Sequence, residues 1–193
     1  MKNKNYPKII CEIINSDSFK TKLSTISYNY TNLKQENNIR NVILEELNQI
    51  LNNTTTRAFA EHPRIEGSRV DLSIIDQNDI KNPYKIEFKY QFTKDDNEME
   101  NYHRIINKDF EFRKSDLFIL TISNWNIEDK KAFDQKWNIS SNLSRYISKT
   151  DNWKKNIIES FKKFKTTELI EFEKIKTESP YGMEYYFFIL KRI

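Results

Sequence analysis

The sequence predicts an α/β fold in which a helix, three strands, a second helix and a fourth strand follow one another. A helix is expected over about Asn32–Leu51, where apolar residues recur at helical spacing: Ile39, Ile43, Leu47 and Ile50. Strict alternation in YKIEFKY predicts a strand over about Tyr84–Gln91. A continuous apolar run, DLFILTIS, predicts a buried strand over Asp116–Ser123. Together these patterns favour a mixed sheet flanked by helices.

The other elements follow from shorter patterns. They are strands at about Thr56–Glu61 and Ser68–Ile75, a loop at Asp76–Pro83, helices at about 95–114 and Asn152–Lys165, and late strands at about Glu168–Ile175 and Glu184–Leu190. One domain is expected over residues 1–193, with a core at about 32–123. The N-terminal segment, 1–31, receives no structural assignment, and residues 124–193 are expected to add a C-terminal helix and strand extension.

Composition limits the class of protein. Of the 193 residues, 37% are hydrophobic and 31% are charged, which is typical of a folded globular chain. The chain has no apolar run of membrane-spanning length, no convincing secretory signal and a single cysteine, so we expect a cytoplasmic protein without a membrane partner. Only two glycines occur, which excludes glycine-rich phosphate loops and hence a nucleotide cofactor. The net charge of +4 weakly favours a polyanionic partner.

The polar face of the YKIEFKY strand carries the candidate chemistry. Lys85, Glu87 and Lys89 lie on one face, opposite the apolar residues. If the preceding strand pairs with this one as a hairpin, Asp71 lies beside Glu87. Two adjacent carboxylates repel each other, and a divalent cation such as Mg²⁺ relieves that repulsion. The face is therefore either an ordinary solvated strand face or half of a metal-dependent site.

Asp71 followed by Glu87-x-Lys89 on the next apolar strand, after a helix and before a helix and strand, resembles the PD-(D/E)xK nuclease superfamily. The resemblance covers roughly residues 32–123 and departs from the family pattern at Val70, which stands where proline is usual. It implies a restriction-endonuclease-like α-β-β-β-α-β core. It also implies an endonuclease that hydrolyses DNA with Mg²⁺, or with Mn²⁺ in its place, of the type II restriction or a related defence type.

The resemblance assigns roles to named residues. Asp71 and Glu87 would hold the metal, with the backbone carbonyl of Phe88 as a further ligand. Lys89 would orient the attacking water and offset charge on the phosphorane. Gln91 continues the same face and is expected to contact the phosphate or a water.

Many family members add a glutamate from the first helix, and Glu36 is the candidate here. It lies three residues before Ile39, on the stripe expected to face the sheet, whereas Glu45 should point to solvent. An acid on a buried stripe is costly unless something binds it. The alternative is that Glu36 is only a helix-start acid.

Asn124, Trp125 and Asn126, just past the fourth strand, together with Lys94, are the candidate nucleic-acid contacts. The alternative interpretation of Asn124–Asn126 is a turn in which the tryptophan packs against the protein. The expected partner is DNA, and cleavage of both strands favours a homodimer. Two alternatives stay open: a non-catalytic nucleic-acid-binding protein that keeps the fold, and an RNA-cleaving toxin or effector that uses the same site.

Overall fold

The computed structural model describes residues 5–62, 64–65, 68–94, 98–140, 148 and 150–193. The helices are α1 (Tyr6–Asn15), α2 (Asp17–Asn29), α3 (Glu36–Ile50), α4 (Met99–Ile106), the π-helical turn η1 (Asn107–Glu111), α5 (Ile127–Lys136) and α6 (Asn152–Phe161). The strands are β1 (Thr56–Ala60), β2 (Arg64–Ile65), β3 (Ser68–Arg69), β4 (Leu72–Asp76), β5 (Tyr84–Phe92), β6 (Leu117–Trp125), β7 (Thr167–Glu171), β8 (Ile175–Thr177) and β9 (Met183–Arg192).

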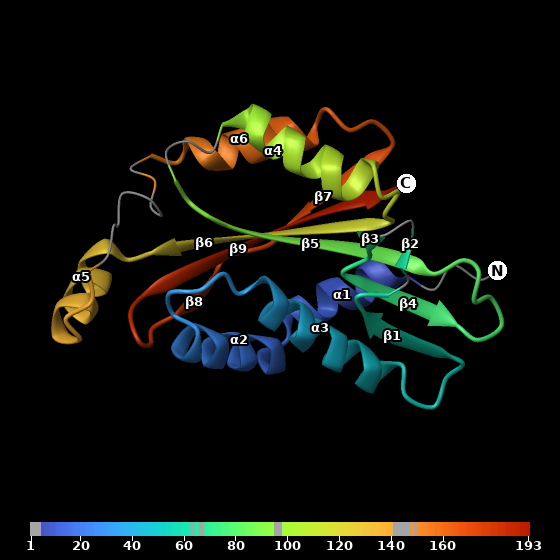
Figure 1. Ribbon diagram of the computed structural model, residues 1–193, viewed down its shortest axis with the longest axis horizontal. Coiled ribbons are helices and arrows are strands. Elements are labelled where there is room, and N and C mark those ends of the chain that lie inside the picture. The colour runs from blue at the N-terminus through green and yellow to red at the C-terminus, as the bar shows by residue number, and fades with distance from the viewer. Residues whose placement is uncertain (1–4, 63, 66–67, 95–97, 141–147, 149) are drawn as a thin grey trace.

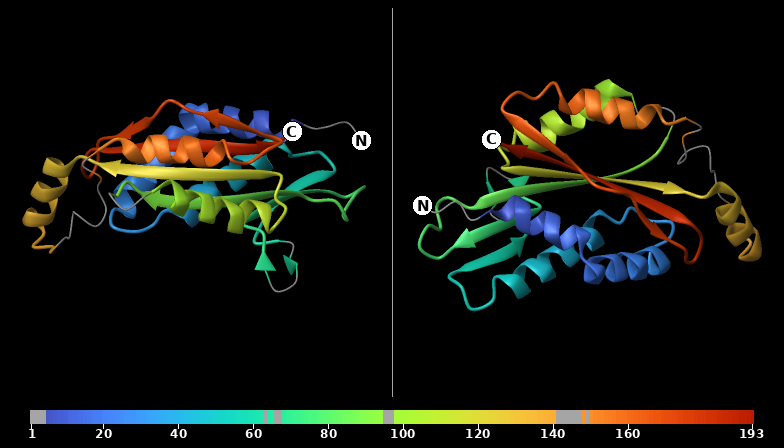
Figure 2. Two further views of the ribbon diagram at one scale, coloured as in Figure 1. Left: turned by 90° about the horizontal axis from the view of Figure 1, so that it is seen from above. Right: turned by 180° about the vertical axis from the view of Figure 1, so that it is seen from behind.

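Seven strands form one open, mixed sheet in the order β1-β4-β5-β6-β9-β7, with β8 also pairing with β9. The β5–β6 pair is parallel, and the other pairs in this sheet are antiparallel. A parallel pair needs a crossover connection, which α4 and η1 provide. The short β2–β3 ribbon stands apart from the main sheet (Figure 2). The α/β class predicted from the sequence is confirmed.

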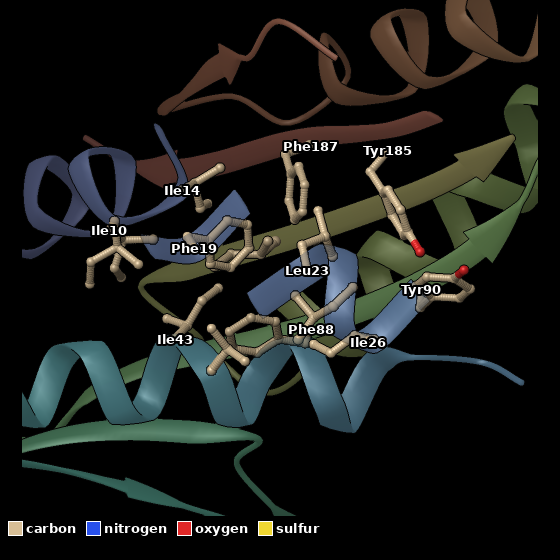
Figure 3. Packing of buried hydrophobic residues seen from close by; sticks show 14 of the residues in the cluster. Ile10, Ile14, Phe19, Leu23, Ile26, Ile43, Phe88, Tyr90, Tyr185 and Phe187 are labelled. Atoms are coloured by element: carbon tan, nitrogen blue, oxygen red, sulfur yellow. The ribbon is translucent and has the colours of Figure 1, made fainter. Parts of the chain in front are cut away.

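Helices cover both faces of the sheet. Figure 1 shows α1, α2 and α3 on one side and α4 and α6 on the other, while α5 projects beyond the end of β6. Alternate residues of β5 lie on opposite faces of the sheet, because successive side chains of a strand point in opposite directions. Phe88 and Tyr90 point toward the α1–α3 layer, where they pack with Leu23, Ile43 and Tyr185 (Figure 3). Glu87 and Lys89 consequently face the other side.

The N-terminal segment, which received no assignment from the sequence, forms α1 and α2. Ile10, Ile13 and Ile14 are buried at helical spacing, so α1 packs as an amphipathic helix. The Ser16 hydroxyl accepts a hydrogen bond from the Phe19 N–H (3.1 Å) and thereby caps α2. Both helices therefore rest on ordinary signals, an apolar stripe and an N-cap.

The helix predicted over 32–51 is α3, which begins later, at Glu36. Ile39, Ile43 and Leu47 are buried as expected. The prediction that Ile50 belongs to the stripe is wrong: Ile50, the last residue of the helix, is 52% exposed, and the adjacent C-cap residue Leu51 is buried in its place.

The strand predicted over 68–75 is interrupted. Ser68–Arg69 pairs with Arg64–Ile65, and the sheet strand β4 starts only at Leu72, which leaves Val70 and Asp71 between the two. The predicted strand at 168–175 is likewise divided into β7 and β8, both of which pair with β9. Because β9 pairs along the whole of β6, the C-terminal part of the chain lies inside the sheet and is no peripheral extension.

The helix predicted over 95–114 is α4 followed by η1, and residues 95–97 at its expected start lie outside the described residues. The helix α5 lies where the sequence patterns predict no helix. None of the helices in the described ranges is both long and apolar enough to cross a membrane.

Candidate active site

The site begins where β4 leaves β5. The two strands pair only from Leu72↔Ile86 to Ile74↔Tyr84, whereas β5 continues to Phe92. Beyond Ile86, side chains replace the missing strand partner. An Asp71 carboxylate oxygen (Oδ2) accepts a hydrogen bond from the Phe88 N–H at 2.8 Å.

Glu36 makes the equivalent contact one step along the same edge. Its Oε2 accepts from the Tyr90 N–H at 2.8 Å. Within a strand, the N–H and C=O of one residue point to the same edge, so the Phe88 carbonyl also lies on the edge that Asp71 and Glu36 line. The first residue of α3 and the residue before β4 thus converge on one stretch of β5.

Continuing the β4–β5 register by one pair places Asp71 opposite Glu87. The Glu87 side chain is completely buried. Its Oε2 accepts from Arg113 Nη1 at 2.6 Å, while its Oε1 finds no hydrogen-bond partner among the described residues. A buried carboxylate oxygen without a donor is costly, which marks this position as one that needs a proton or a cation.

The electrostatics of Glu87 agree with this geometry. Burial, and next the neighbouring Asp71 charge, raise the pKa of Glu87 to about 9; the close approach of the Asp71 side chain adds to the rise, and the Arg113 guanidinium only partly opposes it. Burial also raises the pKa of Glu36, against the Lys89 charge and the Tyr90 N–H, and the Asp71 charge adds to the rise. The three carboxylates therefore act on one another through Asp71.

Basic side chains surround the carboxylates. Lys89 is partly exposed on the Glu87 face, and its Nζ lies 3.8 Å from Oδ2 of the buried Asp109 in η1. Arg113 Nη1 also donates to the Arg69 carbonyl at 3.3 Å. Gln91 follows on the same face and is half-buried. An acidic pair within a basic rim is an arrangement that suits a phosphate together with a divalent cation.

The fit to Mg²⁺ rests on the unpartnered Glu87 Oε1 beside Asp71. In the part of the chain described, no group of three or more acidic, histidine or cysteine side chains already stands in metal-binding positions. Asp71 and Glu36 each direct one carboxylate oxygen at a backbone N–H, and Arg113 holds the second oxygen of Glu87. Asp71, Glu87 and the Phe88 carbonyl, with Glu36 beside them, are nonetheless hard oxygen donors of the kind that Mg²⁺ prefers.

The predicted nucleic-acid contacts lie elsewhere. Phe118 pairs with Glu87, and Asn124 lies six residues further along β6, which corresponds to about 20 Å at strand spacing. Trp125 is only 5% exposed within the core, and the Asn126 side chain caps α5 by accepting from the N–H groups of Glu128 and Asp129. The expectation that the three residues lie past the strand is wrong for Asn124 and Trp125, which belong to β6 and pair with β9, while the tryptophan does pack in the core.

Asn124, Trp125 and Asn126 line a hollow of about 320 Å³ together with residues such as Lys176 and Glu184. Lys94, two residues past the end of β5, is half-buried. The structure does not bring the three residues at the end of β6 to the Asp71–Glu87 pair.

Two residues of the site were missed from the sequence, Arg113 and Asp109. Both lie at the end of the α4–η1 crossover, which returns the chain to β6 beside Glu87. A basic residue shortly before a strand that is parallel to β5 is the available signal, since the crossover has to end near the start of that strand. The three-dimensional direction of the side chain was not readable from spacing.

A comparison of the chain with protein-family models, with curated proteins and with solved structures finds no match.

Proposed function

We propose that this protein is a Mg²⁺-dependent endonuclease that hydrolyses phosphodiester bonds in DNA. One observation carries the proposal: Glu87, buried beside Asp71, has a carboxylate oxygen for which the described part of the chain provides no donor, two residues before a partly exposed lysine. The order α3, β1, β4, β5, α4, β6, with β5 and β6 parallel, supports a restriction-endonuclease-like core. The narrower form of the proposal is a restriction or related defence nuclease, active on duplex DNA as a homodimer.

The roles in this proposal follow from position. Asp71, Glu87 and the Phe88 carbonyl would hold the ion, with Glu36 as a further ligand. A bound Mg²⁺ supplies charge neutralisation at the phosphate and a lower pKa of the attacking water. Lys89, partly exposed on the same face as Glu87, would stabilise the negative charge that grows on the phosphate oxygens. Gln91, two residues further along β5, would orient the phosphate or the water.

The test is incubation of purified protein with plasmid, linear duplex, single-stranded DNA and RNA, in Mg²⁺ and in EDTA. We expect cleavage of at least one DNA substrate in Mg²⁺ only.

Lys89→Ala should lower the rate by about 10²–10³-fold, the usual effect of removing one group that stabilises transition-state charge. The melting temperature should change little, because Lys89 is partly exposed and the Arg113 charge also acts on Asp109, the carboxylate that Lys89 approaches. The control is Lys131→Ala on α5, a surface lysine paired with Glu128. If wild type binds nucleic acid but cuts none of the four, the non-catalytic alternative replaces the proposal; cleavage of RNA alone favours the effector.

A second prediction concerns Glu36. Glu36→Gln should slow cleavage by about tenfold or more, because the amide oxygen can still accept from the Tyr90 N–H but the negative charge toward the metal is lost. Glu45→Gln is the matched control in the same helix: Glu45 is exposed and pairs with Lys22 at 3.3 Å. Single-turnover rates over a Mg²⁺ titration measure both variants. Equal rates for the two would reduce Glu36 to a residue that only supports the edge of β5.

A further inference from the structure

Beside the Asp71–Glu87 pair, the sheet carries a row of side chains that the proposed chemistry does not use. Phe59 of β1 lies opposite Ser73 of β4, and Ser73 lies opposite Lys85 of β5. Lys85 precedes Glu87 by two residues, so the row shares the face of Glu87. In Figure 1, α4 and α6 lie above β5, while β1 and β4, which belong to the same sheet, lie below it.

Phe59 is an unusual residue for this place. It is 39% exposed, while Ala58, next to it, is buried against the α1–α3 layer. The Arg57 guanidinium lies 5.9 Å from the Phe59 ring centroid, and the His62 ring lies 5.8 Å from it. Next in the row, the Oγ of the fully buried Ser73 has no hydrogen-bond partner among the described residues. The exposed part of the row therefore offers an aromatic surface beside a cation.

A second exposed aromatic residue lies in the α4–η1 crossover, next to a residue that contacts the Asp71–Glu87 pair. Phe112 is 83% exposed. It directly precedes Arg113, whose guanidinium holds Glu87 and whose carbonyl accepts from Lys85 Nζ at 3.3 Å. The backbone at Phe112 is thus fixed beside the same row, and its side chain is left in solvent.

We propose that this face binds an unpaired nucleic-acid strand, with bases stacking on Phe59 and Phe112. The inference rests on the proposed function and narrows its substrate to a single strand, either free or opened locally within a duplex. Aromatic rings stack well only on bases that are not already stacked within a duplex. Arg57 and Lys85 supply the positive charge that follows the phosphate backbone.

Binding in EDTA tests the inference separately from cleavage. Fluorescence anisotropy would compare an oligo-dT, an oligo-U, a duplex with a central unpaired bubble and a fully paired duplex. Phe59→Ala and Phe112→Ala should each weaken oligo-dT and bubble binding by about 5- to 100-fold, with less than a twofold effect on the paired duplex. Phe59→Tyr should restore binding because it keeps the ring. The control is Trp137→Ala, a 63% exposed aromatic residue at the end of α5.

The outcomes separate the two proposals. If the variants lose single-strand binding but wild type never cuts, the stacking face stands and the proposed nuclease activity falls. If wild type cuts in Mg²⁺ while Phe59→Ala and Phe112→Ala bind every substrate like wild type, the stacking face is wrong and the activity stands. Equal losses on paired and unpaired substrates, or an equal loss in Trp137→Ala, also overturn the inference. The oligo-dT and oligo-U arms show whether the strand is DNA or RNA.

Discussion

Asp71→Asn is expected to abolish cleavage in Mg²⁺ while leaving nucleic-acid binding in EDTA intact or stronger. The Asp71 carboxylate accepts from the Phe88 N–H at 2.8 Å, and an asparagine side-chain oxygen can accept the same bond. The local backbone should therefore survive the change. The substitution removes the negative charge beside Glu87, and therefore one of the two carboxylates that would hold the ion.

The expected loss is about 10²-fold or more in the cleavage rate, since the ion supplies both water activation and charge stabilisation. Binding of uncut DNA without metal should persist or tighten, because a carboxylate that repels phosphate has been removed. That binding should still weaken steeply with added salt, through counterion release. A gel shift in EDTA beside a cleavage assay in Mg²⁺ measures both quantities.

Asp17→Asn is the matched control, because Asp17 is fully exposed in the first turn of α2. It should cut and bind like wild type. If Asp71→Asn cuts at the wild-type rate, Asp71 only caps the Phe88 N–H and the assigned site is wrong.

Local periodicity carried much of the fold prediction. The alternation of YKIEFKY predicted β5 almost to the residue, and the apolar spacing in residues 32–51 predicted α3, although the helix begins at Glu36 and not at Asn32. These signals depend only on which face of one element is buried. The placement of Asp71 beside Glu87 followed because a short turn-rich loop joins two strands that pair as a hairpin.

Long-range arrangement was not readable in the same way. The position of β9 beside β6 is a matter of strand order in the sheet. The sequence of a single strand does not specify which strands become its neighbours. The sequence also allowed the Glu87 face to be solvated, whereas the α4–η1 crossover buries Glu87 completely and brings Arg113 to it. The helix α5 has no continuous apolar stripe, and its Asn126 cap was interpreted as part of a base-contacting loop.

The buried Glu87 makes a second large effect predictable: Glu87→Gln should stabilise the metal-free protein. The pKa of Glu87 rises from 4.5 to about 9 in the folded state, through burial and then through the Asp71 charge. Between these two values the folded protein binds a proton that the unfolded chain does not bind. Stability from this group is therefore fully present below pH 4.5 and is lost as the pH rises to about 9.

Glutamine carries no such titration, so the stability of Glu87→Gln should exceed that of wild type by an amount that grows with pH. We expect about 1–3 kcal/mol near pH 8, the range for relieving a buried unsatisfied group. For a chain of this size each kcal/mol corresponds to about 2–4 °C in melting temperature. Thermal unfolding in EDTA from pH 5 to 9 measures the difference.

Two controls give the result its meaning. In Glu46, hydrogen bonds from Lys22 and then Ser18 lower the pKa, so Glu46→Gln should lose stability at neutral pH, the opposite sign. Added Mg²⁺ should stabilise wild type by mass action and leave Glu87→Gln unchanged, because the variant lacks the charge that binds the ion. Cleavage by the variant should be abolished in the same buffer.

The sign of this effect decides what the Glu87–Arg113 contact is. If the contact were a structural ion pair, removing one partner would leave Arg113 uncompensated and would destabilise the protein at every pH above 4.5. If the carboxylate is held for a cation, the metal-free protein must bind a proton on Glu87 when it folds between pH 4.5 and about 9, and it gains stability when glutamine makes this position permanently neutral. Destabilisation of Glu87→Gln in EDTA at pH 8, without any Mg²⁺ response in wild type, would therefore assign Glu87 to the fold and remove the central residue of the proposed active site.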